Sequence, residues 1–247
     1  MLALMLMALA TAISCAAAAS ELEQQCEPLL AARKFAEAQD IAQKAIAADP
    51  KNAEAQYYLG LVFIEQNKYT EATPLFEKAV ALAPNISKYH RGLGDAYGLA
   101  ALHDSGVFHK LGMARKSKSA YEKAIELDPK SVNARESLIN YLWEAPAIAG
   151  GGKEKAYAQI DELEKINPSA ARAQRLAYYI KDKKYAEARA LLAAELAANP
   201  ANYRALYQTG QLAALSGDKP AARAAYQAAL AIAPDFNEAK DALEKLQ

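Results

Sequence analysis

One stretch of the sequence has the residue types of a phosphate-binding loop. Residues 142–158, LWEAPAIAGGGKEKAYA, place three consecutive glycines and Lys153 ahead of a helical pattern. The phosphate-binding motif needs a glycine six positions before the lysine and a Ser or Thr after it. Here Ala147 and Glu154 occupy those two positions, and no strand pattern precedes the loop. We therefore interpret the stretch as a turn between two helices.

Other residues suited to catalysis or metal binding are few. The three histidines, His90, His103 and His109, lack the HExxH spacing of a zinc site. His103, Asp104 and His109 are close in sequence, but residues six positions apart do not share a helix face. We expect no catalytic residue, no metal and no cofactor. A metal-dependent enzyme that uses these side chains is an alternative, and bound metal would reveal it.

The composition favours helices and gives the chain no net charge. The 247 residues are 53% hydrophobic, with fourteen tyrosines against five phenylalanines and abundant alanine. Small residues of high helix propensity predict an all-α protein with close helix contacts. The 29 basic and 29 acidic side chains cancel, so no overall field draws the chain to nucleic acid or to an anionic membrane.

The N-terminal segment has the pattern of an export signal. Residues 1–19 contain no charged side chain, and Ala17 and Ala19 form the small-x-small site of signal peptidase. This pattern predicts an exported, periplasmic protein. Two alternatives are an uncleaved apolar helix and a lipoprotein anchored at Cys15, because AISC resembles a lipobox. Cleavage or lipidation leaves Cys26 as the only free thiol, so no internal disulfide forms.

Prolines mark a repeat along the rest of the chain. They follow helical runs at intervals of 34, 45, 39, 32 and 34 residues, at Pro50, Pro84, Pro129, Pro168, Pro200 and Pro234. A period near 34 residues is typical of helix-turn-helix solenoids. Residues 53–86 show the unit most completely, with Leu59, Gly60, Phe63, Tyr69, Ala72, Phe76, Ala79 and Pro84.

This unit resembles the tetratricopeptide repeat, in which small residues set the distance between two antiparallel helices and aromatic residues fill the space beside them. The resemblance implies an all-α, right-handed superhelical solenoid of about six units over residues 20–236, with a capping helix at 237–247. The units are expected at about 19–52, 53–86, 87–131, 132–168, 169–202 and 203–236. Cys26 takes the small position of the first unit, where Pro28 is expected to interrupt the helix.

The third unit carries an insertion at about 98–116, and a basic stretch at residues 107–123 overlaps it. Between residues 107 and 123 the chain has five basic side chains and one acidic side chain, Glu122. The basic residues are Lys110, Arg115, Lys116, Lys118 and Lys123. A basic face could bind an acidic partner or lipid headgroups. We favour a second interpretation, in which Val107, Phe108, Leu111 and Ala114 pack on the neighbouring helix and the lysines are merely solvated. The long third-unit turn and the glycine turn together resemble exported bacterial tetratricopeptide proteins without assigned biochemistry.

In this family the first helices line a concave groove that binds extended peptides or partner helices. The resemblance implies partner-binding residues at Tyr57, Leu61, Lys88, Arg91, Asp95, Asn133, Glu136, Asn140, Trp143, Arg204, Tyr207 and Gln211. The carboxylate clamp of chaperone-binding members is not matched, because Glu23, Glu27, Tyr57 and Leu61 replace its Lys and Asn. Trp143 either contacts a ligand or packs under the insertion.

These patterns together predict a non-enzymatic scaffold in the bacterial cell envelope that holds a protein or peptide. One alternative is a lipid-anchored assembly factor for pilus or outer-membrane machinery. Membrane contact is expected only through that lipid anchor.

Overall fold

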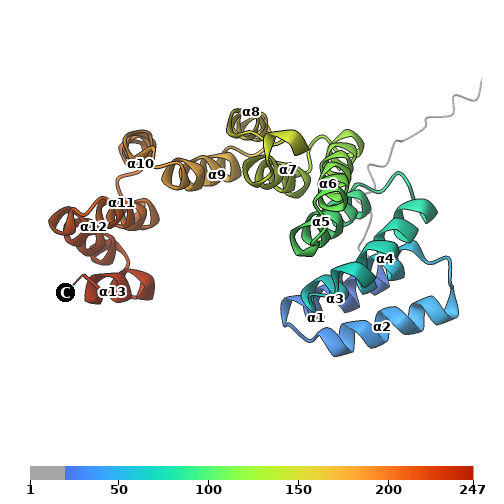
Figure 1. Cartoon of the computed structure of the whole chain (residues 1–247). Helices are drawn as coiled ribbons and strands as arrows, with labels where there is room; N and C mark the ends of the chain where they lie inside the picture. The colour runs from blue at the N-terminus through green and yellow to red at the C-terminus, as the bar shows by residue number, and fades with distance from the viewer. Residues whose placement is uncertain (1–19, 247) are drawn as a thin grey trace, which may run out of the picture. The chain divides into compact units, whose positions relative to one another are not determined.

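A computed structural model describes residues 20–246, so the apolar N-terminal segment and Cys15 lie outside the described residues. Every regular element within residues 20–246 is helical (Figure 1), which confirms the all-α prediction. The elements are α1 (Glu21–Ala31), α2 (Phe35–Ala48), α3 (Ala53–Glu65), α4 (Tyr69–Leu82), α5 (Ser87–His103), α6 (Val107–Leu127), α7 (Val132–Glu144), η1 (Ala147–Ala149), α8 (Lys153–Glu164), α9 (Pro168–Lys181), α10 (Tyr185–Ala198), α11 (Tyr203–Leu215), α12 (Lys219–Ile232) and α13 (Asn237–Glu244).

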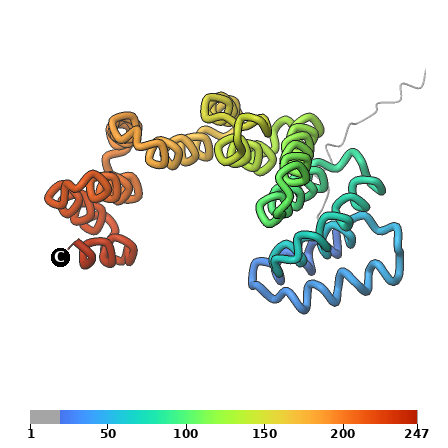
Figure 2. Tube along the Cα trace, viewed as in Figure 1, coloured from blue at the N-terminus to red at the C-terminus, as the bar shows by residue number. Residues whose placement is uncertain are grey.

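The described chain forms two compact parts, each built from consecutive helices that turn back on one another (Figure 2). The N-terminal part contains residues 20–137 and 147–150, and the C-terminal part contains residues 138–146 and 151–246. In the N-terminal part the first helices of successive pairs also touch, as α1 contacts α3 and α3 contacts α5. No helix within residues 20–246 is long and apolar enough to cross a membrane.

Asparagine caps and prolines set where the helices begin and end. Asn52, Asn167 and Asn202 each accept a hydrogen bond at the side-chain oxygen from the N–H three residues on, at 2.9 to 3.1 Å. These caps satisfy N–H groups that have no partner inside the helix. A proline disfavours the α conformation in the residue before it, so α2 ends at Ala48, just ahead of Pro50.

The core of the N-terminal part shows why small residues recur. Phe76 of α4 is fully buried, and its ring lies between the backbones of α3 and α5. A Cβ added to Gly60 would come within 2.8 Å of one edge of this ring, and a Cβ added to Gly92 within 2.5 Å of the other. The sequence predicted a close approach between helices at Gly60 but did not predict the one at Gly92.

The first helix pair corrects one expectation. Pro28 does not interrupt α1, which continues to Ala31, because the N–H of Ala32 still donates to the Pro28 carbonyl at 2.9 Å. Cys26 is fully buried in this helix, as predicted.

The glycine-rich stretch forms a turn between α7 and α8. The Gly151 N–H donates to the Pro146 carbonyl at 3.2 Å, and the Gly152 N–H donates to the Leu142 carbonyl at 2.7 Å. A Cβ on Gly151 would lie 1.9 Å from the Ala145 carbonyl oxygen. The turn therefore needs glycine for its own close contacts, and these two N–H groups are already occupied.

Candidate functional site

Charged side chains link the first helices of the N-terminal part into one face. The Lys88 ammonium on α5 lies 3.2 Å from Glu23 on α1 and 3.5 Å from Glu54 on α3. The Ser20 hydroxyl donates to Glu54 at 2.6 Å. Ser20, Glu54 and Lys88 are 34 residues apart and lie at the start of α1, α3 and α5. These contacts show that the first turns of the three helices lie on a common side, which we call the first-helix face.

A second set of contacts extends this face towards α7. Arg91 donates to Asp95 at 3.0 Å and to the Tyr57 hydroxyl at 3.5 Å. Asp95 also accepts from Tyr121 at 2.8 Å and from Ser137 at 3.5 Å. Burial raises the pKa of Asp95 above its ordinary value, against the opposing effects of Arg91 and the two hydroxyl donors. Arg91 is thus held in a fixed orientation while about a quarter of its side chain stays exposed.

The remaining predicted residues of the N-terminal part differ in exposure. Tyr57 is only 2% exposed, so it supports Arg91 rather than forming the surface. Leu61 and Glu136 are half-buried, and Asn133 is exposed. Sequence reasoning did not select Glu23 and Glu54 as binding residues, although their 34-residue spacing from Tyr57 and Lys88 was the available signal.

Trp143 lies in an aromatic cluster of the C-terminal part. Its ring centroid is 4.3 Å from that of Tyr178 and 5.8 Å from that of Tyr157. The ammonium groups of Lys153 and Lys181 lie 5.1 and 6.0 Å from the Trp143 ring, within the range of cation–π attraction. The half-buried indole is therefore covered by residues of its own chain.

Asn140 accepts a 2.5 Å hydrogen bond from the Tyr178 hydroxyl beside this cluster. Asn140 itself is an exposed residue. Burial raises the pKa of Tyr178 to about 12, so its hydroxyl keeps the donated proton even above the ordinary tyrosine pKa of 10.0.

The predicted residues of α11 border a cavity. Gln211 donates to the Tyr207 hydroxyl at 3.0 Å, and both residues line an open hollow of about 470 Å³ together with Tyr226 and residues of α13. Arg204 is exposed on the same helix, with its guanidinium 5.3 Å from the Tyr203 ring. Arg204 and Gln211 therefore have the exposure that partner contact requires, whereas Tyr207 is half-buried against the rings of Tyr226 and Phe236.

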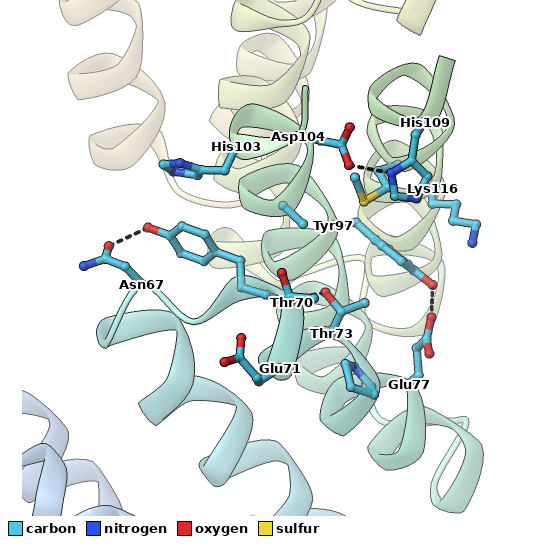
Figure 3. A pocket seen from close by; sticks show the side chains of 14 residues that line it. Asn67, Thr70, Glu71, Thr73, Glu77, Tyr97, His103, Asp104, His109 and Lys116 are labelled. Atoms are coloured by element: carbon cyan, nitrogen blue, oxygen red, sulfur yellow. Dashed lines mark hydrogen bonds and ion pairs between the residues drawn. The ribbon is translucent and has the colours of Figure 1, made fainter. Parts of the chain in front are cut away.

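A second cavity, of about 560 Å³, lies between α4 and the longer helices α5 and α6 (Figure 3). The Tyr97 hydroxyl donates to Glu77 at 2.5 Å, and Lys116 lies 5.2 Å from the Tyr97 ring. Across the cavity, the His103 ring stacks on the Tyr69 ring, with 4.8 Å between the two ring centroids. The cavity combines aromatic, acidic and basic side chains, and no predicted groove residue lines it.

His103, Asp104 and His109, the three candidate metal ligands, do not meet at one point. His109 donates to Asp104 at 2.5 Å, and this hydrogen bond, together with one from the Gly106 N–H, lowers the pKa of Asp104. His103 instead stacks on Tyr69. Within residues 20–246 no group of three His, Cys, Asp or Glu side chains is placed to hold a metal ion.

The predicted packing of the insertion is wrong at its first turn. Val107 and Phe108 were expected to pack on the neighbouring helix, but they are 75% and 91% exposed. The reason is helix length, because α6 has 21 residues whereas α4 and α7 have 14 and 13. Leu111 and Ala114, one or two turns further on, are half-buried.

Helix pairs of this period, with small residues under aromatic rings, define a helical-repeat protein. A sequence profile of the tetratricopeptide repeat matches residues 29–87 and 178–235, and a second profile of the same description matches residues 106–131. The chain belongs to the tetratricopeptide-repeat family. No curated protein sequence matches it.

Solved structures share this fold at low sequence identity. TTC0263, a thermophilic tetratricopeptide-repeat protein of Thermus thermophilus, is 15% identical, with 93% of this chain and 98% of that chain covered and a TM-score of 0.54. A human IFIT1 dimer with m7Gppp-AAAA is 18% identical, with 85% of this chain and 54% of that chain covered and a TM-score of 0.53. At these identities the likeness establishes the fold alone.

Proposed function

We propose that this protein is a scaffold that binds an extended peptide or a partner protein through the first helices of its repeats. The observation that carries the proposal is the first-helix face, where Lys88 is held by carboxylates of the neighbouring helices α1 and α3, and Arg91 by Asp95 of its own helix. Side chains fixed before binding lose little conformational entropy on contact, so they suit the recognition of main-chain amides and polar side chains.

The C-terminal part contributes Arg204, Tyr207 and Gln211 to the same proposal. Tyrosine and arginine are enriched among the residues that dominate binding energy at protein interfaces. Tyr207 and Gln211 also border a cavity of about 470 Å³, which is large enough for one side chain of a bound segment. The proposal includes no nucleic acid and no cofactor.

We further propose that the protein is exported and acts in the bacterial cell envelope. The support is the apolar N-terminal sequence with its small-x-small site. The lipoprotein alternative, an assembly factor anchored at Cys15, predicts a mature chain that begins at an acylated cysteine. Mass spectrometry of the mature N-terminus distinguishes the two, and elemental analysis of the same material tests the metal-enzyme alternative.

Two arginines of one repeat allow a matched test of the binding face. Arg204 lies on α11, the first helix of its pair, and Arg223 lies on α12, the second; both are exposed. Immobilised parent, Arg204→Glu and Arg223→Glu proteins are each incubated with solubilised envelope proteins, and captured proteins are quantified. We expect Arg204→Glu to weaken capture of a partner about thirtyfold, which corresponds to a hot-spot loss of about 2 kcal/mol.

Arg223→Glu makes the same charge change and should leave capture within twofold of the parent, because it lies outside the proposed face. Circular dichroism confirms that both variants remain folded. If Arg223→Glu abolishes capture while Arg204→Glu preserves it, the partner binds the second helices and the proposal is wrong.

A further inference from the structure

Three of the four most exposed large apolar side chains of the described chain lie at or beside the first turn of α6. Leu102 is 68% exposed, Val107 75%, Phe108 91% and Ile148 68%, and no other large apolar residue within 20–246 reaches these values. Single exposed apolar residues are ordinary, but a group of them usually marks a binding surface.

Chain geometry places these residues together. Helix α5 ends at His103 and α6 begins at Val107, so Leu102, Val107 and Phe108 all lie at one end of this helical hairpin. We call these three residues the apolar tip. At this end α5 and α6 extend beyond the shorter neighbouring helices α3, α4 and α7.

The exposed surface continues along α6 towards η1. Gly112 follows Phe108 by four positions, and Arg115 follows Gly112 by three. The three residues therefore share one side of the helix. A Cβ built on Gly112 meets no atom within 4 Å, so nothing covers this side of α6 at that point. Arg115 lies roughly 10 Å along the helix from Phe108, and its guanidinium donates to the Ile148 carbonyl at 3.2 Å.

Cations follow the apolar tip along α6. Between residues 98 and 118 the chain has Lys110, Arg115, Lys116 and Lys118, and Asp104 is the only acid. The Asp104 carboxylate already accepts from His109 and from the Gly106 N–H. Glu71 and Glu77 belong to α4, on the opposite wall of the 560 Å³ cavity.

The shape and the charge of this surface favour a lipid bilayer over a folded protein partner. A side chain that is 91% exposed has no surrounding walls to form a pocket, whereas a protruding ring fits the soft boundary between headgroups and acyl chains. The flanking lysines and arginine complement anionic headgroups. We propose that the apolar tip inserts into the surface of an anionic membrane, with Lys110, Arg115 and Lys116 close to lipid phosphates.

Vesicle binding of the full chain tests this proposal. Vesicles of phosphatidylglycerol with phosphatidylethanolamine are compared with vesicles of phosphatidylcholine by co-sedimentation. We expect stronger binding to the anionic vesicles, and at least a tenfold loss in the Val107→Ser, Phe108→Ser double variant. The Lys110→Gln, Lys116→Gln variant should lose about fivefold per lysine, on anionic vesicles only.

The matched control is Leu215→Ser, which removes another exposed apolar side chain, 58% exposed at the end of α11, and should change binding less than twofold. The N-terminal segment is identical in all variants, so differences between them report on the tip. As a local readout, Phe108→Trp should be quenched by brominated acyl chains, and Leu215→Trp should not.

Equal binding of the parent to both kinds of vesicle would overturn the proposal. So would a Val107→Ser, Phe108→Ser variant that binds as the parent does. If that variant instead loses a protein partner while vesicle binding is unchanged, the tip is a protein interface and the membrane assignment is wrong.

Discussion

At the scale of single residues, the ring of Phe76 shows how strictly the repeat limits side-chain size. The backbones at Gly60 and Gly92 contact opposite edges of this fully buried ring. The ring therefore cannot shift away from one glycine without moving towards the other. We expect Gly60→Ala to lower the free energy of unfolding by about 1–3 kcal/mol, the usual cost of overpacking. Urea denaturation measures the change.

Gly112 provides the control for that substitution. It lies inside α6 with open space around its added Cβ. Gly112→Ala should therefore raise stability by roughly 0.5–1 kcal/mol, because alanine loses less conformational freedom in a helix. Equal effects of the two alanine substitutions would show that the close approach at Gly60 is not the cause.

Cys26 should react very slowly with thiol reagents. Burial, followed by the charges of Glu54 and Glu27, raises the pKa of this thiol from 9.0 to about 11. That shift alone lowers the reactive thiolate fraction about a hundredfold at neutral pH, and complete burial slows access further. Labelling of native and denatured protein, read by peptide mass spectrometry to separate Cys26 from Cys15, measures the difference. Native labelling as fast as denatured labelling would contradict the burial.

Asp95 predicts a pH dependence of stability. Its folded-state pKa is raised by burial, so between the ordinary value of 3.8 and the raised value the folded protein binds more protons than the unfolded chain. The contribution of Asp95 to stability therefore falls as pH rises through this window. Asp95→Asn cannot titrate, so the parent should lose stability relative to this variant between acid and neutral pH. Urea denaturation at both pH values tests the sign.

At the scale of elements, the turn between α7 and α8 is a structural link whose N–H groups are already bonded. Gly151 donates to the Pro146 carbonyl of the turn and Gly152 to the Leu142 carbonyl of α7, so their amide hydrogens should exchange slowly without any ligand. Hydrogen exchange of the 146–152 segment is measured with and without ATP. We expect protection that ATP does not change. Fast exchange that slows when ATP is added would instead support a phosphate-binding loop.

The α5–α6 hairpin shows how helix length creates new surface. The two helices have 17 and 21 residues, whereas α3 and α4 have 13 and 14. The extra turns leave Val107 and Phe108 without a neighbour, and they also form one wall of the cavity beside α4.

At the scale of the whole molecule, contacts run between neighbouring helices, so local damage should stay local. Gly210→Ala places a Cβ within 2.5 Å of the Tyr226 ring in the C-terminal part. We expect faster hydrogen exchange across α11 to α13, with exchange in α1 to α4 unchanged, because those helices belong to the other compact part. A uniform change along the chain would show that the two parts unfold as one unit.

The sequence alone determined the helical repeat, because its signals are local and recur. Proline ends each pair, asparagine caps several helices, and a glycine faces an aromatic ring, as at Gly60 and Phe76. Each of these features acts within one or two turns or between helices that follow one another. A period near 34 residues therefore suffices to predict them.

Tertiary structure decided which residues of that pattern are accessible. Tyr57 and Arg91 occupy the same register position, yet Tyr57 is buried and Arg91 is partly exposed, because each depends on the helices packed beside it. Phe108 has the spacing of a packed residue, but its helix extends beyond its neighbours. Helical periodicity fixes the direction in which a side chain points, and only the lengths and positions of other helices determine whether anything lies there.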